Sequence, residues 1–226
     1  MEEPRYHVID HWRTVASSYP RASHDGWSVT AREKAPGQYR MNGPSSFYYL
    51  PKAIELTALM EGERGWFDDD PRQMYALAEI GLFRARGRVI VGGLGLGLIQ
   101  HFLALNENVT SVTTFERGEA LKRLVWPYLI PEAHDKGQLI IGDFYERAPD
   151  FQADTVITDF LFGSWNETTW AELQAQREFC REHFPEAIFL EHGYQAKMDA
   201  ETVAEAIPPS LIAPAGTVFD SVKVFR

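Results

Sequence analysis

The chain has 226 residues, a formal net charge of −10, one cysteine, and 45% hydrophobic and 13% aromatic residues. Its length suits one α/β domain with a small extra lobe, and its apolar content excludes a disordered chain. The negative charge argues against nucleic acid and anionic membranes as partners, and a single cysteine excludes an intrachain disulfide or a multi-cysteine zinc site.

No targeting or membrane-spanning segment is predicted. No apolar stretch reaches about 18 residues, the length that a transmembrane helix requires. The first residues, Met1 to Arg5, do not have the pattern of a signal peptide. The sequence therefore predicts a cytoplasmic protein that does not bind membranes.

Residues 1–69 are predicted to form a small N-terminal β lobe. Residues 1–45 show no clear period and are interpreted as irregular structure or short strands. Further along, alternate residues from Ile54 to Met60 are apolar, as on one face of a strand. Residues 61–65 are typical of a hairpin turn before Trp66 and Phe67.

A helix start follows the lobe. Asp70 has the position of an N-cap and Pro71 lies in the first turn, so a helix is expected from residue 70 to about Arg84. Strands are then predicted at 88–92, 109–115, 138–141, 154–158 and 186–191, and helices at 96–105, 117–126, 167–183 and 199–206. Strands separated by helices indicate an open, doubly wound parallel sheet, so residues 70–226 would form one Rossmann-like domain. At its end, Ser221–Phe225 alternate as an antiparallel strand does.

Residues 88–97 are the most informative motif. An apolar run from Val89 to Val91 stops in a loop, residues 92–97, that contains four glycines, and an apolar helical pattern follows at once. Glycines let the backbone turn sharply and let a ligand lie against it. The helix N-terminus behind the loop offers unpaired N–H donors. The motif therefore predicts a site for a nucleotide-like cofactor.

Acidic residues follow the next three predicted strands. Glu116 ends the second strand, where a carboxylate can accept hydrogen bonds from the ribose hydroxyls of an adenosine. Asp143 ends the third strand and Asp159 the fourth. Because parallel strands end at one edge of the sheet, all three acids are expected to face one crevice. Glu116 and Asp159 each have a purely structural alternative, since Glu116 can be an exposed acid next to the cap of the helix at 117–126 and Asp159 can cap the following turn.

Residues 88–160 resemble the class I S-adenosylmethionine-dependent methyltransferases, most closely their spermidine-synthase-like branch. The matching segments are residues 89–97, 115–116, 141–143 and 154–159. The β lobe and the helix after Asp70 extend the likeness to roughly residues 45–226. The resemblance implies a sheet of seven strands whose last strand is antiparallel, preceded by the small β lobe.

The resemblance also implies roles for individual residues. Gly93, Gly95 and Gly97 would lie against the methionine part and the ribose of S-adenosylmethionine, and Glu116 would bind the ribose hydroxyls. Asp143 and Phe144 would border the adenine, and Asp159 would lie near the sulfonium and the acceptor.

Two departures from the family pattern bear on the reaction. Methyltransferases often carry an acid two residues before the first loop glycine, where this chain has Val91. Polyamine synthases carry an aspartate within the loop that binds the amine of decarboxylated S-adenosylmethionine, where this chain offers Gly95 or Leu96. The second departure favours methyl transfer over aminopropyl transfer. A nicotinamide dinucleotide is disfavoured because the third glycine comes one residue early for its fingerprint.

Asp159 and His192 are the candidate catalytic residues, with Glu191 at the same sheet edge. Methyl transfer depends mainly on orientation, and a base is needed only for a protonated or weakly nucleophilic acceptor. Asp159 could orient or deprotonate an amine, and His192 titrates near neutral pH. A loop histidine without a catalytic role is the alternative for His192.

Acids also precede the first helix. Asp68 and Asp69 could contribute to a site for a cationic amine, or could stabilise the helix dipole. No metal-ligand spacing is present in the sequence.

The sequence thus predicts an S-adenosylmethionine-dependent methyltransferase that acts on a small molecule or a peptide. No nucleic acid, membrane or metal is expected, and an aromatic β lobe would suit a homodimer. The alternatives are a spermidine-synthase-like aminopropyltransferase and a non-catalytic adenosine-binding protein of the same fold.

Overall fold

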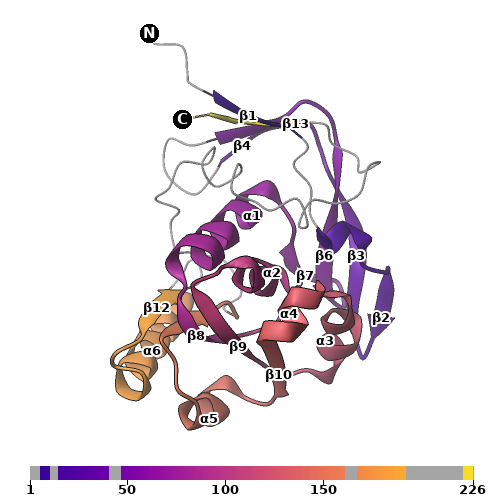
Figure 1. Ribbon diagram of the computed structural model, residues 1–226. Coiled ribbons are helices and arrows are strands. Elements are labelled where there is room, and N and C mark those ends of the chain that lie inside the picture. The colour runs from indigo at the N-terminus through magenta and orange to yellow at the C-terminus, as the bar shows by residue number, and fades with distance from the viewer. Residues whose placement is uncertain (1–5, 11–14, 41–46, 161–166, 192–220, 226) are drawn as a thin grey trace.

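The computed structural model describes residues 6–10, 15–40, 47–160, 167–191 and 221–225 (Figure 1). These residues form three sheets, one of five parallel strands and two of four antiparallel strands. In Figure 1 the parallel sheet and its helices fill the lower part of the molecule, and the antiparallel strands lie above and to the right.

The parallel sheet has the strand order β10-β9-β8-β11-β12. Its strands are β8 (Gly87–Gly92), β9 (Val109–Glu116), β10 (Gly137–Ile141), β11 (Thr155–Thr158) and β12 (Ile188–Glu191). Within this sheet, the first strand in sequence is β8, which lies in the middle. The chain continues outward through β9 and β10 and then returns to the other side of β8 at β11. In such sheets the crevice at this reversal, outside the carboxyl ends of the strands, is where ligands bind.

Helices cover both faces of the parallel sheet. They are α1 (Pro71–Ala78), α2 (Leu98–Leu105), α3 (Glu119–Leu124), α4 (Pro131–Lys136), α5 (Phe144–Arg147) and α6 (Glu167–His183). Within β8, Val89 and Val91 pack into the core that contains α1 and α2, whereas Ile90 packs with Phe144 of α5 and Cys180 of α6. Because side chains alternate between the faces of a strand, the whole apolar run of β8 is buried.

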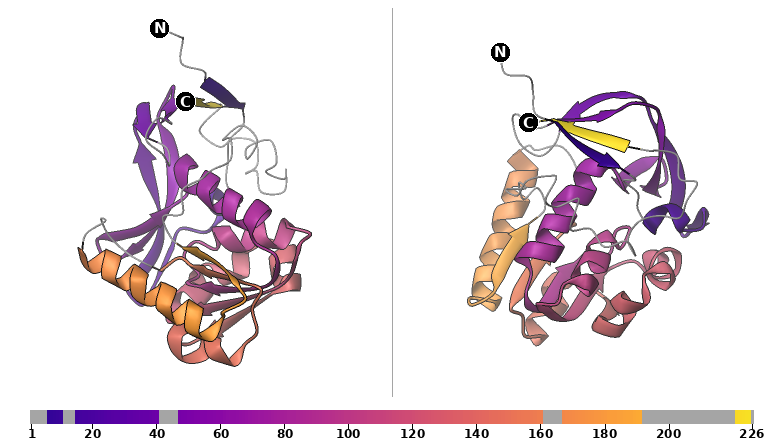
Figure 2. Two further views of the ribbon diagram at one scale, coloured as in Figure 1. Left: turned by 90° about the vertical axis from the view of Figure 1, so that its left-hand side faces the viewer. Right: turned by 45° about the horizontal axis from the view of Figure 1, so that its top comes forward.

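The antiparallel sheets contain most of the N-terminal third of the chain. One has the order β2-β3-β6-β7, with β2 (Ala22–His24), β3 (Trp27–Lys34), β6 (Ile54–Glu61) and β7 (Arg64–Asp68). The other has the order β1-β13-β5-β4, with β1 (Tyr6–Asp10), β13 (Ser221–Phe225), β5 (Phe47–Leu50) and β4 (Gly37–Arg40). Figure 2 shows β13 beside β1, although these strands come from opposite ends of the sequence.

The α/β architecture with a parallel central sheet is confirmed. The predicted count of seven strands is not: within the described residues the central sheet has five. The predicted last strand, Ser221–Phe225, is antiparallel, but it pairs with β1 and β5 and not with the central sheet. The predicted helix at 199–206 lies outside the described residues. The domain boundary after residue 69 stays a prediction.

The predicted first helix is interrupted by a change of hydrogen bonding. It is α-helical over Pro71–Ala78 and continues as a π-helix over Glu79–Arg84. The Asn106 side chain donates hydrogen bonds to the carbonyls of Gly81 and Ala85, at 2.7 and 3.0 Å. Side-chain insertion of this kind is a recognised cause of local departures from the α-helix.

Asp70 joins the start of α1 to both antiparallel sheets. As predicted, it is the N-cap, and its Oδ1 accepts a hydrogen bond from the Arg72 N–H at 2.8 Å. Its Oδ2 accepts a second from the Tyr48 hydroxyl at 2.8 Å and forms an ion pair with Lys34. Asp70 is 6% exposed, so this network is largely removed from water.

No helix among the described residues is both long enough and apolar enough to span a membrane.

Candidate functional site

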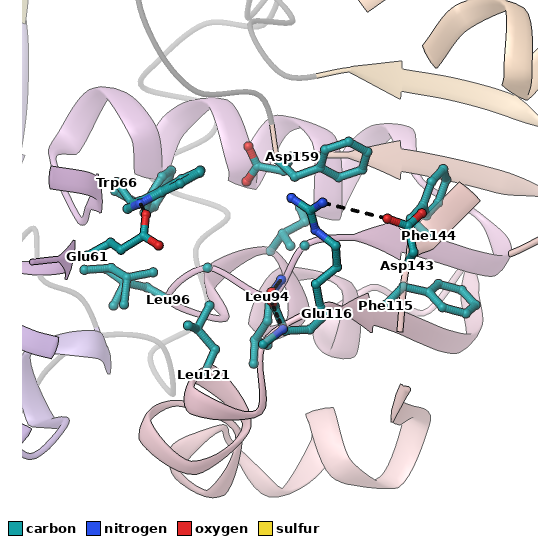
Figure 3. A pocket seen from close by; sticks show the side chains of 18 of the residues that line it. Glu61, Trp66, Leu94, Leu96, Phe115, Glu116, Leu121, Asp143, Phe144 and Asp159 are labelled. Carbon is teal, nitrogen blue, oxygen red and sulfur yellow. Dashed lines mark hydrogen bonds and ion pairs between the residues drawn. The ribbon is translucent and has the colours of Figure 1, made fainter. Parts of the chain in front are cut away.

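A cavity of about 710 Å³ lies between the carboxyl edge of the parallel sheet and the β6–β7 hairpin. Figure 3 shows Glu61 and Trp66 of the hairpin region at one end and Asp143 and Phe144 at the other, with Asp159 between them. The two ends are therefore built by different sheets, and the predicted glycine loop lies along the cavity between them.

The glycine loop has the backbone conformation that requires glycine. Gly93, Gly95 and Gly97 have φ values of 91°, 52° and 70°. A Cβ on Gly93 would lie 2.9 Å from the carbonyl oxygen of Asp159, and one on Gly97 would lie 2.4 Å from Cδ2 of Leu129. A Cβ on Gly95 would meet no atom within 4 Å. The loop is thus close-packed at its two ends and open to the cavity at Gly95.

Glu116, at the end of β9, holds the loop in place. Its Oε2 accepts a hydrogen bond from the Leu94 N–H at 3.0 Å, and its Oε1 accepts one from the Gly118 N–H at 2.8 Å. The side chain lines the cavity. A carboxylate has about four acceptor positions, so each oxygen retains capacity for a further donor from a ligand.

A buried hydrogen bond supports the loop from behind. The Tyr19 hydroxyl donates to the Leu96 carbonyl at 3.1 Å and lies 2.9 Å from Nε2 of His101. Burial lowers the pKa of His101 to about 3, so this imidazole is neutral at physiological pH. The N-terminal segment therefore contributes to the rigidity of the loop.

Asp143 and Phe144 form the end of the cavity next to β10. Asp143 is the N-cap of α5, and its Oδ1 accepts a hydrogen bond from the Tyr145 N–H at 2.8 Å. Its Oδ2 lies 3.8 Å from the guanidinium of Arg117. Phe144 is buried and packs edge-on against Phe115, with 6.0 Å between the ring centroids. This end combines a fixed acceptor with an apolar ring.

The structure describes one of the two predicted catalytic residues, Asp159. Asp159 lines the cavity, and its N–H donates to the Gly92 carbonyl at 3.0 Å, which fixes its backbone against the loop. His192 lies outside the described residues. Glu191, the other candidate base, forms a bidentate ion pair with Arg177 and is not among the residues that line the cavity.

The far wall of the cavity was not predicted from the sequence. Trp27 of β3 and Trp66 of β7 pack with 5.5 Å between their ring centroids, and the Trp66 Nε1–H donates to Glu61 at 2.9 Å. The Arg64 guanidinium lies 4.9 Å from the Trp66 ring. These residues add an aromatic surface with a carboxylate beside it, a combination that favours cationic or planar groups.

Acidic side chains outnumber basic ones along the cavity. Among the described lining residues, the single guanidinium is Arg117, and the carboxylates are Glu61, Glu116, Asp143, Asp159 and Glu172. Such a lining concentrates cations and repels anionic ligands. No group of three or more His, Cys, Asp or Glu side chains in the described part of the chain is arranged to hold a metal ion.

Asp68 and Asp69 do not line the cavity. Asp68 forms an ion pair with Arg32 at 3.3 Å. Asp69 is 2% exposed, and its Oδ1 accepts a hydrogen bond from the Thr57 N–H at 2.8 Å. These contacts hold the end of β7 and the connection to α1 against β3 and β6, so neither acid is placed to bind an amine in the cavity.

Burial raises the pKa of Asp69 to about 7, and the stability of the protein is expected to depend on pH for this reason. The pKa of Asp69 in the unfolded chain is about 4. At pH values between about 4 and 7, Asp69 therefore binds a proton only in the folded state, so the free energy of unfolding falls as the pH rises through this range. From pH 5 to pH 8 the wild type should lose roughly 2–3 kcal/mol relative to Asp69→Asn. Urea unfolding at several pH values measures the difference, with the exposed Asp150→Asn as the control. Parallel pH profiles for Asp69→Asn and wild type would contradict it.

Comparisons with known proteins find similarity only among solved structures. No protein-family model matches the sequence, and no curated protein matches it. A probable spermidine synthase from Corynebacterium glutamicum is 18% identical, covering 61% of this chain and 56% of its own length, with a TM-score of 0.39. CalO1, a methyltransferase of calicheamicin biosynthesis, is 20% identical, covering 59% of this chain and 41% of its own, with a TM-score of 0.40.

A 23S rRNA methyltransferase, ErmE, is 16% identical over 70% of this chain and 68% of its own length, with a TM-score of 0.39. The chain spans about half the length of the spermidine synthase and less than half of CalO1. Both groups that the sequence resembles are therefore among these structures.

Proposed function

We propose that this chain is a class I S-adenosylmethionine-dependent methyltransferase that acts on a small-molecule or peptide acceptor. The observation that carries the proposal is that the glycine loop, Glu116 and Asp143 meet on one cavity at the carboxyl edge of the parallel sheet. Strand order alone predicts a ligand at this edge, and the residue types select an adenosyl group.

The residues at the cavity suit this cofactor in shape and charge. A volume of about 710 Å³ lies within the range of small-molecule sites. The open space at Gly95 lets a ligand lie against the backbone, and Glu116 retains acceptor capacity for two ribose hydroxyls. S-adenosylmethionine is cationic at its sulfonium and its amine, which matches the acidic lining.

In this proposal the residues of the chain act by binding and orientation. Gly93 to Gly97 would lie against the methionine part and ribose, and Asp143 with Phe144 would border the adenine. Asp159 would orient the acceptor and favour the nearby positive charge. When bound, S-adenosylmethionine supplies a methyl group that is activated for in-line displacement, so correct placement provides most of the acceleration.

The acceptor would enter at the end of the cavity formed by Glu61, Trp27 and Trp66. This wall belongs to the antiparallel sheet and lies at the opposite end from Asp143 (Figure 3). The packed tryptophan pair, whose ring planes are tilted by 39°, and the neighbouring carboxylate favour an acceptor with a planar or cationic part. Whether His192 supplies a base, and whether the protein forms a homodimer, stay predictions.

Isothermal titration calorimetry with four ligands tests the proposal. S-adenosylmethionine and S-adenosylhomocysteine are expected to bind, and NAD is not, because the loop lacks the dinucleotide spacing. Clearly tighter binding of decarboxylated S-adenosylmethionine would favour the aminopropyltransferase, despite the loop that lacks an aspartate. Absence of binding by every adenosyl ligand would overturn the proposal. Binding without transfer to any acceptor would leave the non-catalytic alternative.

A further inference from the structure

Gln176 of α6 lines the cavity with a buried amide that makes no hydrogen bond within the described part of the chain. Its side chain is 0% exposed. Neither Oε1 nor Nε2 makes a hydrogen bond to any of the described residues. A buried polar group in this state is costly, and it is rare in proteins unless a ligand or a water completes its bonding. The position on the cavity wall points to a ligand.

The surroundings of Gln176 place it at the Asp143 end of the cavity. Phe179, one helical turn further along α6, packs against Phe144 and Tyr145, with ring centroids 5.5 and 4.9 Å apart. Residues three apart on a helix share a face, so Gln176 and Phe179 both face α5. The Tyr145 hydroxyl approaches the Gln176 amide without reaching hydrogen-bond geometry.

We propose that Gln176 recognises the edge of the adenine ring of the bound cofactor, which makes it a specificity-determining residue. The inference rests on the proposed function and adds a residue to it. An amide offers one acceptor and a donor side by side, the pattern that complements the 6-amino group of adenine and the adjacent ring nitrogen. The 6-amino group has two hydrogens, so Gln176 Oε1 and the Asp143 carboxylate would each accept one.

This arrangement gives the two residues different tasks. Asp143 is already fixed by the Tyr145 N–H and by Arg117, so it is a ready acceptor before the ligand arrives. Among the described residues, Gln176 has only the nearby Tyr145 hydroxyl and no hydrogen bond of normal geometry, so in this proposal it gains both of its hydrogen bonds on binding. Loss of Gln176 should therefore reduce affinity without reducing the stability of the free protein, the opposite of what loss of a structural residue does.

Gln176→Met tests the proposal, because methionine has a similar length and no hydrogen-bonding amide. The probes are S-adenosylhomocysteine and its analogue without the 6-amino group, titrated by calorimetry. We expect Gln176→Met to bind S-adenosylhomocysteine about tenfold more weakly than wild type, the effect of losing one or two neutral hydrogen bonds. For the analogue without the 6-amino group, the loss of affinity caused by Gln176→Met should be smaller. Gln174→Met is the matched control, since Gln174 lies on the same helix and does not line the cavity.

Thermal unfolding of the ligand-free proteins gives the second readout. The melting temperature of Gln176→Met should equal that of wild type or exceed it, because an unsatisfied amide is removed from the interior. Unchanged affinity for S-adenosylhomocysteine in Gln176→Met, as a bound water satisfying the amide would produce, would overturn the inference. So would a melting temperature clearly below that of wild type. If wild type itself binds neither adenosyl ligand, the proposed function fails first and this inference falls with it.

Discussion

Replacing Glu116 with alanine is expected to weaken the binding of S-adenosylhomocysteine by about tenfold or more, because charge-assisted hydrogen bonds to two ribose hydroxyls are lost. The change also removes the acceptor for the Leu94 N–H, which lies in the glycine loop. Both effects act on the same ligand, so this should be the largest loss of affinity from a single substitution at the cavity. Calorimetry with purified variants measures it.

Two further variants separate the effects on ligand and loop. Glu119→Ala removes an exposed carboxylate three residues away, which pairs with Lys122, and should leave affinity unchanged. Glu116→Gln keeps one acceptor oxygen for the loop but loses the charge, so it should retain more stability than Glu116→Ala while still binding weakly. Affinity within about twofold of wild type in Glu116→Ala would show that the ribose binds elsewhere.

Replacing Asp70 with alanine is expected to lower the free energy of unfolding by about 3 kcal/mol, the largest single effect on stability. Loss of an N-cap costs about 0.5–2 kcal/mol, and breaking a mostly buried ion pair leaves its partner without compensation. Asp70 performs both tasks, since it caps α1 and binds Lys34 and Tyr48.

Urea unfolding with comparison of m-values measures the effect of Asp70→Ala. Asp70→Asn should recover part of the loss, because its side-chain oxygen can still accept the hydrogen bond from Arg72. Asp135→Ala, at an exposed position of α4, serves as the control and should change stability by less than about 0.5 kcal/mol. If Asp70→Ala also lowered the free energy of unfolding by less than about 0.5 kcal/mol, the cap and the ion pair would contribute little to stability.

The parallel sheet was predictable because its signals are local. The apolar run from Val89 to Val91 indicates a buried strand from its own residues alone, and the helix predicted at 167–183 is α6 in the structure. The strand β3 was less apparent, although the sequence contains its signal. Asp25 and Gly26 have φ values of 47° and 80°, as a tight hairpin turn requires, and Asp-Gly is a favoured pair for such turns.

The partner of the C-terminal strand could not be predicted from its own residues. Alternation in Ser221–Phe225 indicates a strand, but an antiparallel strand can pair with any open edge. The central sheet and the strands β1 and β5 all offer such edges, and the choice depends on contacts between distant parts of the chain.

The residues of the candidate site likewise include some that the local sequence predicts and others that depend on tertiary packing. Glu116, Asp143 and Asp159 could be predicted because strand ends of a parallel sheet must meet at one edge. Trp66 reaches the cavity only through the hairpin, whose orientation the local sequence does not determine. Gln176 is one of several polar residues on α6, and its burial depends on the packing of α5 against that helix.

The pairing of β13 with β1 and β5 has a consequence for the order of events during synthesis. Tyr6 lies opposite Phe225, so the two strands are separated by nearly the whole length of the chain. A ribosome releases the N-terminal residues long before residues 221–225, and β1 and β5 lack this shared neighbour until the last strand emerges. Pairings of such high sequence separation form slowly and leave strand edges exposed. The glycine loop contacts Tyr19, Glu116 and Asp159, all of which precede residues 221–225 in the chain, so this part of the molecule can fold on the ribosome before the sheet closes.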